Sequence, residues 1–475
     1  MTPSRFTDDS VPETGIRKLF TTAGHWQRWL DVEGALALAE ADAGVVPPDA
    51  AAAIAAAARL EGLDKGRIRA GIAESGHPLM PLITELTRVV GEDYGGWVHW
   101  GATTQNITQT GDALLLRDAH RRLLALLGRA LAAAADLAER GAEMPMAGRT
   151  HGQHAVPVTF GFKAAVWIDE LLRHLDRMRR CEPAVFAAML GGAVGTHAAL
   201  GADGPRVQAR LAERLGLWPM DVPARSTADG LAEYVCVLAL LAGTGGKIGR
   251  ELYSLMQTEY GEVLEPAAPG DVGSSTMPHK RNPKLSQDMM TISAQIRALV
   301  PQALEAMHAD HEADGAYTAM LDDAVTRACV LAGDQLVRLA VVLEGLELDP
   351  ERMRANLDLT GGLIVSEAVM LALGKVIGRQ EAHSVVSEAA HRAAAGESTF
   401  AGLLESDPRV TTYLTVADLA ALLDPTRHLG LSAQLARAGA ERARAAVQDI
   451  GSDQGSWDVS PAASTSACTS VISSP

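Results

Sequence analysis

The sequence predicts an all-α protein, and three observations support this class. Alanine and leucine dominate the composition, whereas phenylalanine, tryptophan and tyrosine make up only 4% of the 475 residues. Residues that favour strands never gather into regular alternating runs. Apolar residues instead recur at spacings of three and four, the pattern of a helix with one buried face. With 47% hydrophobic residues the chain can bury a large core, and its length indicates two or three domains.

The N-terminal section, residues 1–110, is expected to form a small helical domain. Apolar residues recur at helical spacing over residues 26–43, and the pair Pro47 and Pro48 ends this predicted helix. The segments that follow are shorter, because glycine and proline interrupt them. They lead to a polar turn at residues 101–106.

Long helical stretches follow and define a central domain, residues 111–360. They are predicted over residues 107–141, 158–181, 228–263, 284–309 and 323–346. Helices this long, with extensive apolar faces, must pack against partner helices in the same chain or in another subunit. The sequence therefore predicts a central bundle of long helices.

A third section, residues 361–450, is expected to form a C-terminal helical domain. Its helices are shorter and include residues 364–377 and 379–395. Residues 451–475 are rich in serine, alanine, threonine and proline and show no periodicity. We therefore expect a disordered tail there.

Charge and composition exclude several classes of function. The formal net charge is −16 and basic residues are scattered, which argues against a nucleic-acid partner. The N-terminus has no basic region followed by an apolar stretch, and no run of about 18 apolar residues lacks charge. We therefore expect a cytoplasmic protein that does not span a membrane. The four cysteines show no metal-ligand spacing and no glycine-rich nucleotide fingerprint follows a strand, so no metal and no organic cofactor is expected.

The least ordinary stretch is the loop from Gly270 to Pro283, which reads GDVGSSTMPHKRNP between two predicted long helices. A polar loop punctuated by glycine and proline can be a simple connector. This one also offers the amides of a Gly-Ser-Ser turn, the N-terminal end of the following helix and the cation of Lys280. Together these groups could hold a carboxylate and stabilise charge that develops on it.

This loop resembles the signature of the fumarase/aspartase superfamily of lyases, GSSxMPxKxNP, and contains every fixed position of that pattern. Two further regions of the superfamily occur in the expected order. They read HWGATTQN at residues 99–106 and GRTHGQHA at residues 148–155. The resemblance extends over most of the chain, from residue 12 to residue 450.

The resemblance implies a reaction in which a serine removes a proton from a carbon next to a carboxylate, before the leaving group departs as fumarate forms. Ser274 matches that serine. Its hydroxyl is too weak an acid to ionise at neutral pH unless positive potential, here from Lys280 and the loop amides, supports the anion. Ser275 and Asn282 match positions that bind a carboxylate of the product. Met277 would contribute its backbone amide, although its side chain is better suited to packing.

The other two regions supply further candidate residues. Thr103, Thr104 and Gln105 match positions that grip a carboxylate through hydrogen bonds, although such a run would also suit a helix cap. Thr150 matches a threonine that hydrogen-bonds the substrate. His151 is a candidate general acid for the leaving group, or a group that orients it.

Two candidates lie outside these motifs. His77 resembles the position of a second active-site histidine in adenylosuccinate lyases. Arg225 precedes a long helix on which the superfamily places polar residues that face a shared cleft. The alternatives are a structural histidine and an ordinary surface charge. Whether His77 or His151 would be the general acid stays open.

Details elsewhere resemble the branch that contains adenylosuccinate lyase and 3-carboxy-cis,cis-muconate cycloisomerase. Bacterial cycloisomerases of this branch tend to carry a tryptophan where this chain has His151, so the histidine favours an eliminating lyase. The branch pattern Glu-Arg-Asp reads Glu-Ala-Asp at residues 312–314, so an arginine suited to a nucleotide phosphate is missing. Asn106 and Gln109 replace residues that are usually acidic, which also favours a smaller substrate.

These features predict a lyase that removes a nitrogen-containing leaving group from a small substituted succinate, either an N-substituted aspartate or nitrosuccinate, to give fumarate. The alternatives are a cycloisomerase, an adenylosuccinate lyase and a noncatalytic structural protein on the same scaffold. The resemblance also implies a homotetramer with a twenty-helix core, in which each active site takes residues from three subunits. Neither the leaving group nor the physiological direction follows from the sequence.

Overall fold

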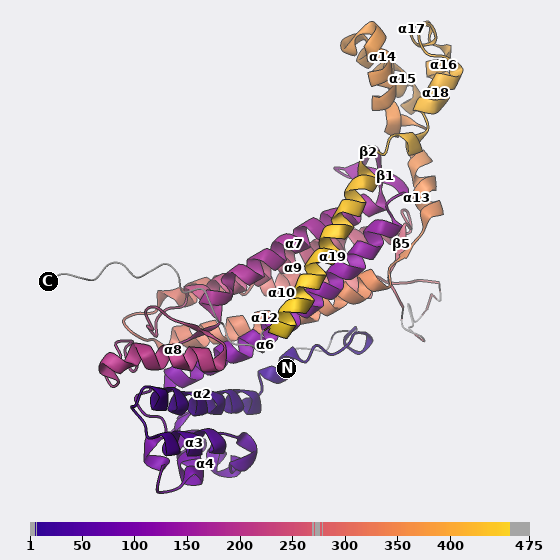
Figure 1. The fold of residues 1–475 in the computed structure, drawn as a ribbon. Helices are drawn as coiled ribbons and strands as arrows, with labels where there is room; N and C mark the ends of the chain where they lie inside the picture. The colour runs from indigo at the N-terminus through magenta and orange to yellow at the C-terminus, as the bar shows by residue number, and fades with distance from the viewer. Residues whose placement is uncertain (1–4, 6, 268–269, 271–275, 278, 457–475) are drawn as a thin grey trace, which may run out of the picture.

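The computed structural model describes residues 5, 7–267, 270, 276–277 and 279–456. The described chain is predominantly helical, so the all-α prediction is confirmed. Figure 1 shows a group of N-terminal helices, a bundle of long central helices and an outlying group of short C-terminal helices.

The N-terminal helices are short apart from α2 (Thr22–Asp42). The others are α1 (Ile16–Leu19), α3 (Pro48–Ala57), α4 (Lys65–Ser75) and α5 (Met80–Val90), with the 3-10 turns η1 (Asp8–Ser10), η2 (Leu60–Gly62) and η3 (Gly95–Trp97). Trp26 and Leu30 are buried where α2 packs in the core. Pro48 opens α3 at the position where a missing backbone N–H costs least.

The central bundle consists of α6 (Thr104–Arg140), α7 (Phe160–Val185), α9 (Asp229–Leu255), α10 (Lys284–Arg297) and α12 (Gly315–Glu344). Helix α6 packs against α7 and α12, and α9 packs against α7, α10 and α12 (Figure 1). Leucine, valine and alanine fill the contacts, as expected for packed apolar helix faces. Because an α-helix rises about 1.5 Å per residue, α6 spans roughly 55 Å.

Helix α9 is long and apolar enough to cross a membrane by length and composition alone. Its most apolar window has a mean hydropathy of 1.4, but 61% of that window is buried inside the fold. Leu238 and Leu252 are among the buried residues of α9. Packing in the bundle therefore accounts for its apolar character. The bent pair Pro350–Thr360 and Leu363–Ile377 passes the same test only if both segments count as one span.

Short strands and helices connect the long helices. The antiparallel hairpin of β1 (Pro145–Thr150) and β2 (Gln153–Thr159) lies between α6 and α7. Strand β3 (Ala187–Ala188) pairs in parallel with β4 (Trp218–Pro219), and β5 (Val263–Leu264) pairs antiparallel with β6 (Glu347–Leu348). The connecting helices are α8 (Gly204–Leu215) and α11 (Val300–Glu305), with the 3-10 turns η4 (Gly201–Asp203) and η5 (Ala306–His308).

The C-terminal helices form a separate group with its own hydrophobic cluster, which includes Val369, Phe400 and Leu419. The group consists of α14 (Ser366–Ile377), α15 (Arg379–Ala394), α16 (Phe400–Ser406), α17 (Pro408–Thr411) and α18 (Val416–Leu422), with the 3-10 turns η7 (Leu363–Val365) and η8 (Pro425–Arg427). Helix α13 (Pro350–Leu357) and the 3-10 turn η6 (Asp358–Thr360) precede this group, and α13 packs against β1. Helix α19 (Ser432–Ser456) returns to the bundle and packs against α6 and α7 (Figure 1). The domain boundaries remain predictions.

Candidate active site

The predicted carboxylate-binding residues Thr103, Thr104 and Gln105 lie at the N-terminal end of α6. Thr103 is its N-cap residue, so the run does cap a helix. The buried Asn106 fixes this end, because its Oδ1 accepts hydrogen bonds from the amides of Thr103 at 3.1 Å and Gly192 at 3.2 Å. An amide oxygen makes both contacts without adding a negative charge beside the helix end.

His77 lies beside this helix end, although 26 residues separate it from Thr103. Its Nδ1 accepts hydrogen bonds from the amides of Leu79 at 3.2 Å and Met80 at 3.0 Å, at the start of α5. In the neutral ring the proton is therefore on Nε2. This Nε2 lies 3.4 Å from Thr104 Oγ1. His77 thus presents a hydrogen-bond donor next to a predicted substrate-binding hydroxyl.

Arg225 and Gln105 hold each other through a reciprocal pair of hydrogen bonds. Arg225 Nε donates to Gln105 Oε1 at 2.7 Å, and Gln105 Nε2 donates to the Arg225 carbonyl at 3.2 Å and to Gln109 at 3.1 Å. Arg225 Nη1 also donates to the carbonyl of Ala193 at 2.7 Å. The structure therefore brings Arg225, the candidate with the least distinctive sequence context, next to the first motif.

A buried ion pair that the sequence does not reveal anchors the segment before Thr103. His99 Nδ1 lies 2.6 Å from Glu33 Oε1 on α2, and the Glu33 side chain is fully buried. Burial lowers the pKa of His99, but the hydrogen bond and charge of Glu33 outweigh it, so the pKa is raised. His99 has a φ of +63°, which is uncommon for a residue with a side chain. The pair fixes the direction in which the chain enters α6.

Thr150 and His151 lie at the tip of the β1–β2 hairpin. Thr150 pairs with Gln153, so His151 and Gly152 form a two-residue turn. Their φ values are +52° and +75°, the sign that both central residues of a type I′ turn require. A histidine in this conformation is strained relative to glycine or asparagine. Its side chain is exposed, so the strained turn presents an imidazole to the surroundings of this chain.

Arg149, one residue before that tip, is held by a buried carboxylate. Its Nη2 and Nη1 donate to Glu262 Oε1 and Oε2 at 2.7 and 3.0 Å, and Glu262 is fully buried. Asn356 Nδ2 donates to the same carboxylate at 2.7 Å, and the guanidinium lies 4.8 Å from the ring centroid of Tyr260. Burial and the nearby charge of Arg149 lower the pKa of His154 on β2.

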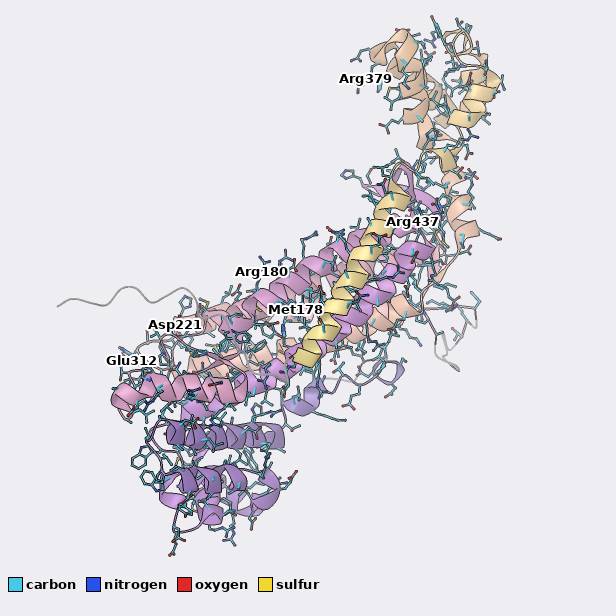
Figure 2. All side chains as sticks on the ribbon, viewed as in Figure 1. Met178, Arg180, Asp221, Glu312, Arg379 and Arg437 are labelled. Atoms are coloured by element: carbon cyan, nitrogen blue, oxygen red, sulfur yellow. The ribbon has the colours of Figure 1, made fainter. Side chains whose placement is uncertain are left out.

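The first two motifs lie at opposite ends of the bundle within one chain. Thr104 begins α6, whereas Arg140 ends it just before β1, and the helix between them is roughly 55 Å long. Figure 1 shows the hairpin at the far end of the bundle from α2 and α8, and in Figure 2 Asp221 and Arg437 mark these two ends. One chain therefore does not bring His151 to Thr104 or His77.

Of the signature loop, Ser274 and Ser275 lie outside the described residues. Met277 and Lys280 are exposed, the Lys280 amide donates to the Met277 carbonyl at 3.0 Å, and Asn282 lies just before α10. At the end of the loop, Arg281 Nη2 donates a hydrogen bond to the Glu265 carbonyl at 2.7 Å.

The start of α10 differs from the prediction. Glu265 accepts hydrogen bonds from the amides of Leu285 at 3.0 Å and Ser286 at 2.8 Å. Burial raises the pKa of Glu265 despite these bonds. The Glu265 carboxylate therefore already accepts the hydrogen bonds of these two amides. The prediction that the N-terminal end of α10 binds a substrate carboxylate is wrong for the amides of Leu285 and Ser286. Carboxylate binding by Lys280 and by the other loop residues remains a prediction.

No cluster of three or more histidine, cysteine, aspartate or glutamate side chains suited to a metal ion occurs among the described residues. That the reaction needs neither metal nor cofactor remains a prediction.

Comparison with protein families identifies two matches that together cover most of the chain. The profile described as lyase matches residues 8–298, and the profile described as adenylosuccinate lyase C-terminus matches residues 362–438. The first match contains all three motif regions, and the second covers the C-terminal group of helices.

Individual relatives carry different names. The chain is 42% identical over 440 residues to a 3-carboxy-cis,cis-muconate cycloisomerase of Pseudomonas aeruginosa, covering 92% of this chain and 95% of the relative. It is 38% identical over 426 residues to an N-acetyl-S-(2-succino)cysteine lyase of Dickeya dadantii, covering 88% and 92%. The crystal structure of the 3-carboxy-cis,cis-muconate lactonizing enzyme from Pseudomonas putida superimposes with a TM-score of 0.84 at 37% identity, covering 94% of this chain and 100% of that one.

Proposed function

The chain belongs to the fumarase/aspartase superfamily of lyases, and from this premise we propose that it eliminates a nitrogen-containing group from a small substituted succinate to give fumarate. The substrate is an N-substituted aspartate or nitrosuccinate. No step uses a metal or an organic cofactor. The protein acts in the cytoplasm, with no nucleic-acid or membrane partner.

The observation that carries this proposal is the presentation of His151. An exposed imidazole on a strained two-residue turn can exchange a proton with a departing group. Elimination of an amine needs such a group, because the departing nitrogen must take up a proton, whereas nitrite would leave as the anion. Lysine and arginine would be poor substitutes, since only histidine titrates near neutral pH without a large pKa shift.

The roles follow from the chemistry of the elimination. Ser274 takes the proton from the carbon next to a carboxylate, and the electrons of that C–H bond form the second bond of the alkene. The electron pair of the C–N bond leaves with the nitrogen. His151 protonates a departing amine, whereas nitrite departs as the anion and takes no proton. Lys280, Asn282, Ser275 and the Met277 amide stabilise the carboxylate on which negative charge accumulates.

Residues of the first two motifs hold the other end of the substrate. Thr103, Thr104, Gln105 and Thr150 hydrogen-bond the carboxylates, and Arg225 supplies positive charge through its contact with Gln105. His77 acts as a hydrogen-bond donor through Nε2, because two backbone amides occupy its Nδ1. These contacts support a division of roles in which His151 transfers the proton and His77 donates a hydrogen bond.

A complete site requires more than one subunit. The length of α6 supports this, since it separates Thr104 from the hairpin by roughly 55 Å. We propose a homotetramer in which long helices form a twenty-helix core and each site combines Thr104 and His77 of one subunit, His151 of a second and Ser274 of a third. Superfamily members are typically oligomeric, which agrees with this arrangement.

A cycloisomerase is the second candidate, favoured by the 42% identity to the Pseudomonas aeruginosa relative. The relative named for a succinylated cysteine also makes a sulfur leaving group a specific alternative. Purified protein should be incubated separately with nitrosuccinate, N-substituted aspartates, adenylosuccinate, N-acetyl-S-(2-succino)cysteine and 3-carboxymuconate. We expect fumarate from the first two classes at the highest kcat/KM.

Each of the other possible results of this substrate panel would support one of the alternative functions. A lactone from 3-carboxymuconate with no fumarate would establish a cycloisomerase and overturn the proposal. Preference for adenylosuccinate or the cysteine derivative would replace the proposed leaving group. Absence of any product, with normal folding and assembly, would favour a noncatalytic protein on the same scaffold.

A further inference from the structure

A cavity of about 870 Å³ lies at the end of the bundle where α6 begins. Residues from α2, α6, α12 and the segment before α9 line it, and Asp221, labelled in Figure 2, marks this end of the molecule. Its volume falls in the range of sites for small organic ligands. Gln105 and Arg225 of the proposed site also line it. The cavity is therefore a continuation of the region where the first motif would bind substrate.

The cavity is strongly acidic. Among its described lining residues are five aspartates, one arginine and one histidine. The guanidinium of Arg225 is directed to two neutral acceptors, Gln105 Oε1 and the Ala193 carbonyl, each at 2.7 Å. The carboxylates thus outnumber the cations available to balance them.

Two of these carboxylates come from different helices, line the same cavity and repel each other. Asp112 on α6 lies 3.0 Å from His25 Nδ1 on α2, and Asp322 on α12 lies near both. The surrounding protein and the charge of Asp112 raise the pKa of Asp322 to about 7, whereas His25 lowers it. One imidazole therefore does not neutralise both carboxylates. A cation entering the cavity would relieve this repulsion.

The apolar part of the cavity wall suits the hydrocarbon part of an organic cation. Phe20, Trp26, Trp29 and Tyr317 contribute aromatic side chains, and Leu321 adds aliphatic surface. Aromatic faces attract ammonium groups, and they also pack well against alkyl chains. An inorganic cation would gain little from such walls, whereas a protonated amine would use both the carboxylates and the aromatic rings.

We propose that this cavity takes the departing group, and that it selects substrates whose departing group is a protonated amine over those that release an anion such as nitrite. This inference rests on the proposed elimination and narrows its two substrate classes to N-substituted aspartates. When the C–N bond breaks, its electron pair remains on nitrogen, and the amine takes up a proton to become an ammonium ion. The carboxylates of Asp112 and Asp322 stabilise that ion, whereas they would repel nitrite.

Binding of small probes tests the selectivity without requiring turnover. Titration calorimetry at constant ionic strength should compare butylammonium, butanol and butyrate, which share a similar carbon chain and differ in charge. We expect butylammonium to bind about tenfold more tightly than butanol, and butyrate to bind most weakly. Asp322→Asn should reduce the preference for butylammonium over butanol about tenfold.

The neighbouring residue provides a matched control. Asp323 is the same type of residue on the same helix, but it accepts a hydrogen bond from Gln302, pairs with Arg327 and is not part of the cavity wall. Asp323→Asn should leave the preference unchanged. Equal affinity for butylammonium and butanol, or an equal effect of both substitutions, would overturn the proposal.

Turnover distinguishes this inference from the proposed function. If the cavity prefers butylammonium but no substituted succinate yields fumarate, the proposed elimination fails and the amine site stands. If nitrosuccinate yields fumarate faster than N-alkyl aspartates, and Asp322→Asn does not change their ratio, the elimination stands and the proposed selectivity fails.

Discussion

Arg149 and Glu262 form a two-point ion pair, with N–O distances of 2.7 and 3.0 Å, although 113 residues separate them. The pair joins the end of β1 next to the hairpin turn to the segment before β5. Glu262 is fully buried and also accepts a hydrogen bond from Asn356 Nδ2, so both Arg149 and Asn356 hold its carboxylate in place. The proposed proton donor His151 is two residues beyond Arg149. We infer that this pair determines where the hairpin tip is presented.

Glu262→Gln should destabilise the protein and reduce activity, because it leaves the partly buried Arg149 without its counter-charge. Breaking a buried pair in this way costs about 3–5 kcal/mol. The control is Glu344→Gln, because Glu344 also makes a multiple contact with an arginine, Arg129, but both side chains are more than 40% exposed. That change should cost under about 1 kcal/mol. Chemical denaturation of both variants checks the difference, and equal losses would contradict the role of burial.

His77→Asn should separate the two functions of this histidine. The asparagine oxygen can replace Nδ1 as acceptor for the amides of Leu79 and Met80, but no donor replaces Nε2 beside Thr104. We expect kcat/KM to fall about 100-fold with little change in thermal stability. His77→Ala, which loses both functions, should also lower the melting temperature. Wild-type activity of the asparagine variant would show that the Nε2 donor has no role.

Arg225→Lys should raise KM about tenfold for the proposed dicarboxylate substrate, because an ammonium group does not reproduce the separate contacts to Gln105 and Ala193. The expected effect on kcat is smaller. Arg214→Lys is the control, since Arg214 pairs with Asp42 on the surface. Steady-state kinetics would contradict the assignment if both variants had the same KM as the wild type.

Glu40 should make stability depend on pH. Burial, with a further contribution from Glu33, raises its pKa from 4.5 to about 8 in the folded chain. The folded state therefore keeps a proton that the unfolded state loses, so stability should fall by about 1.4 kcal/mol per pH unit as pH rises from 4.5 towards 8.

Melting temperatures at pH 5 and pH 8 measure this effect. Glu40→Gln should show a smaller loss between the two values, whereas Glu61→Gln, at an exposed position, should match the wild type. If the wild type and Glu40→Gln lose stability equally over this range, Glu40 is not the responsible group.

The long helices could be predicted because their apolar periodicity is continuous over many residues. Residues 107–141 and 158–181 correspond to α6 and α7. The predicted ends of the helices are less accurate where a proline or a capping residue interrupts the apolar pattern. The predicted helix over residues 284–309 divides into α10 and α11 because Pro301 stands at the start of α11, and α12 begins at Gly315, earlier than predicted, after the cap provided by Asp314.

The β1–β2 hairpin could not be predicted from periodicity, because its strands are short and its turn reads His-Gly rather than Asn-Gly. The motifs still identified Thr150 and His151 as candidates. The tertiary partners of the motif segments could not be predicted in this way. Nothing near Glu262 or Glu33 in the sequence indicates a contact with Arg149 or His99. Such contacts depend on tertiary packing that local patterns do not encode.

Mixing two inactive variants tests the account most directly. His151→Ala and Ser274→Ala should each fail to release fumarate from an N-substituted aspartate. If each site takes these residues from different subunits, random reassembly of an equal mixture should restore about a quarter of the wild-type fumarate rate. Reassembled mixtures that stay as inactive as the separate variants, although tetramers of mixed composition form, would contradict a shared site that performs this elimination.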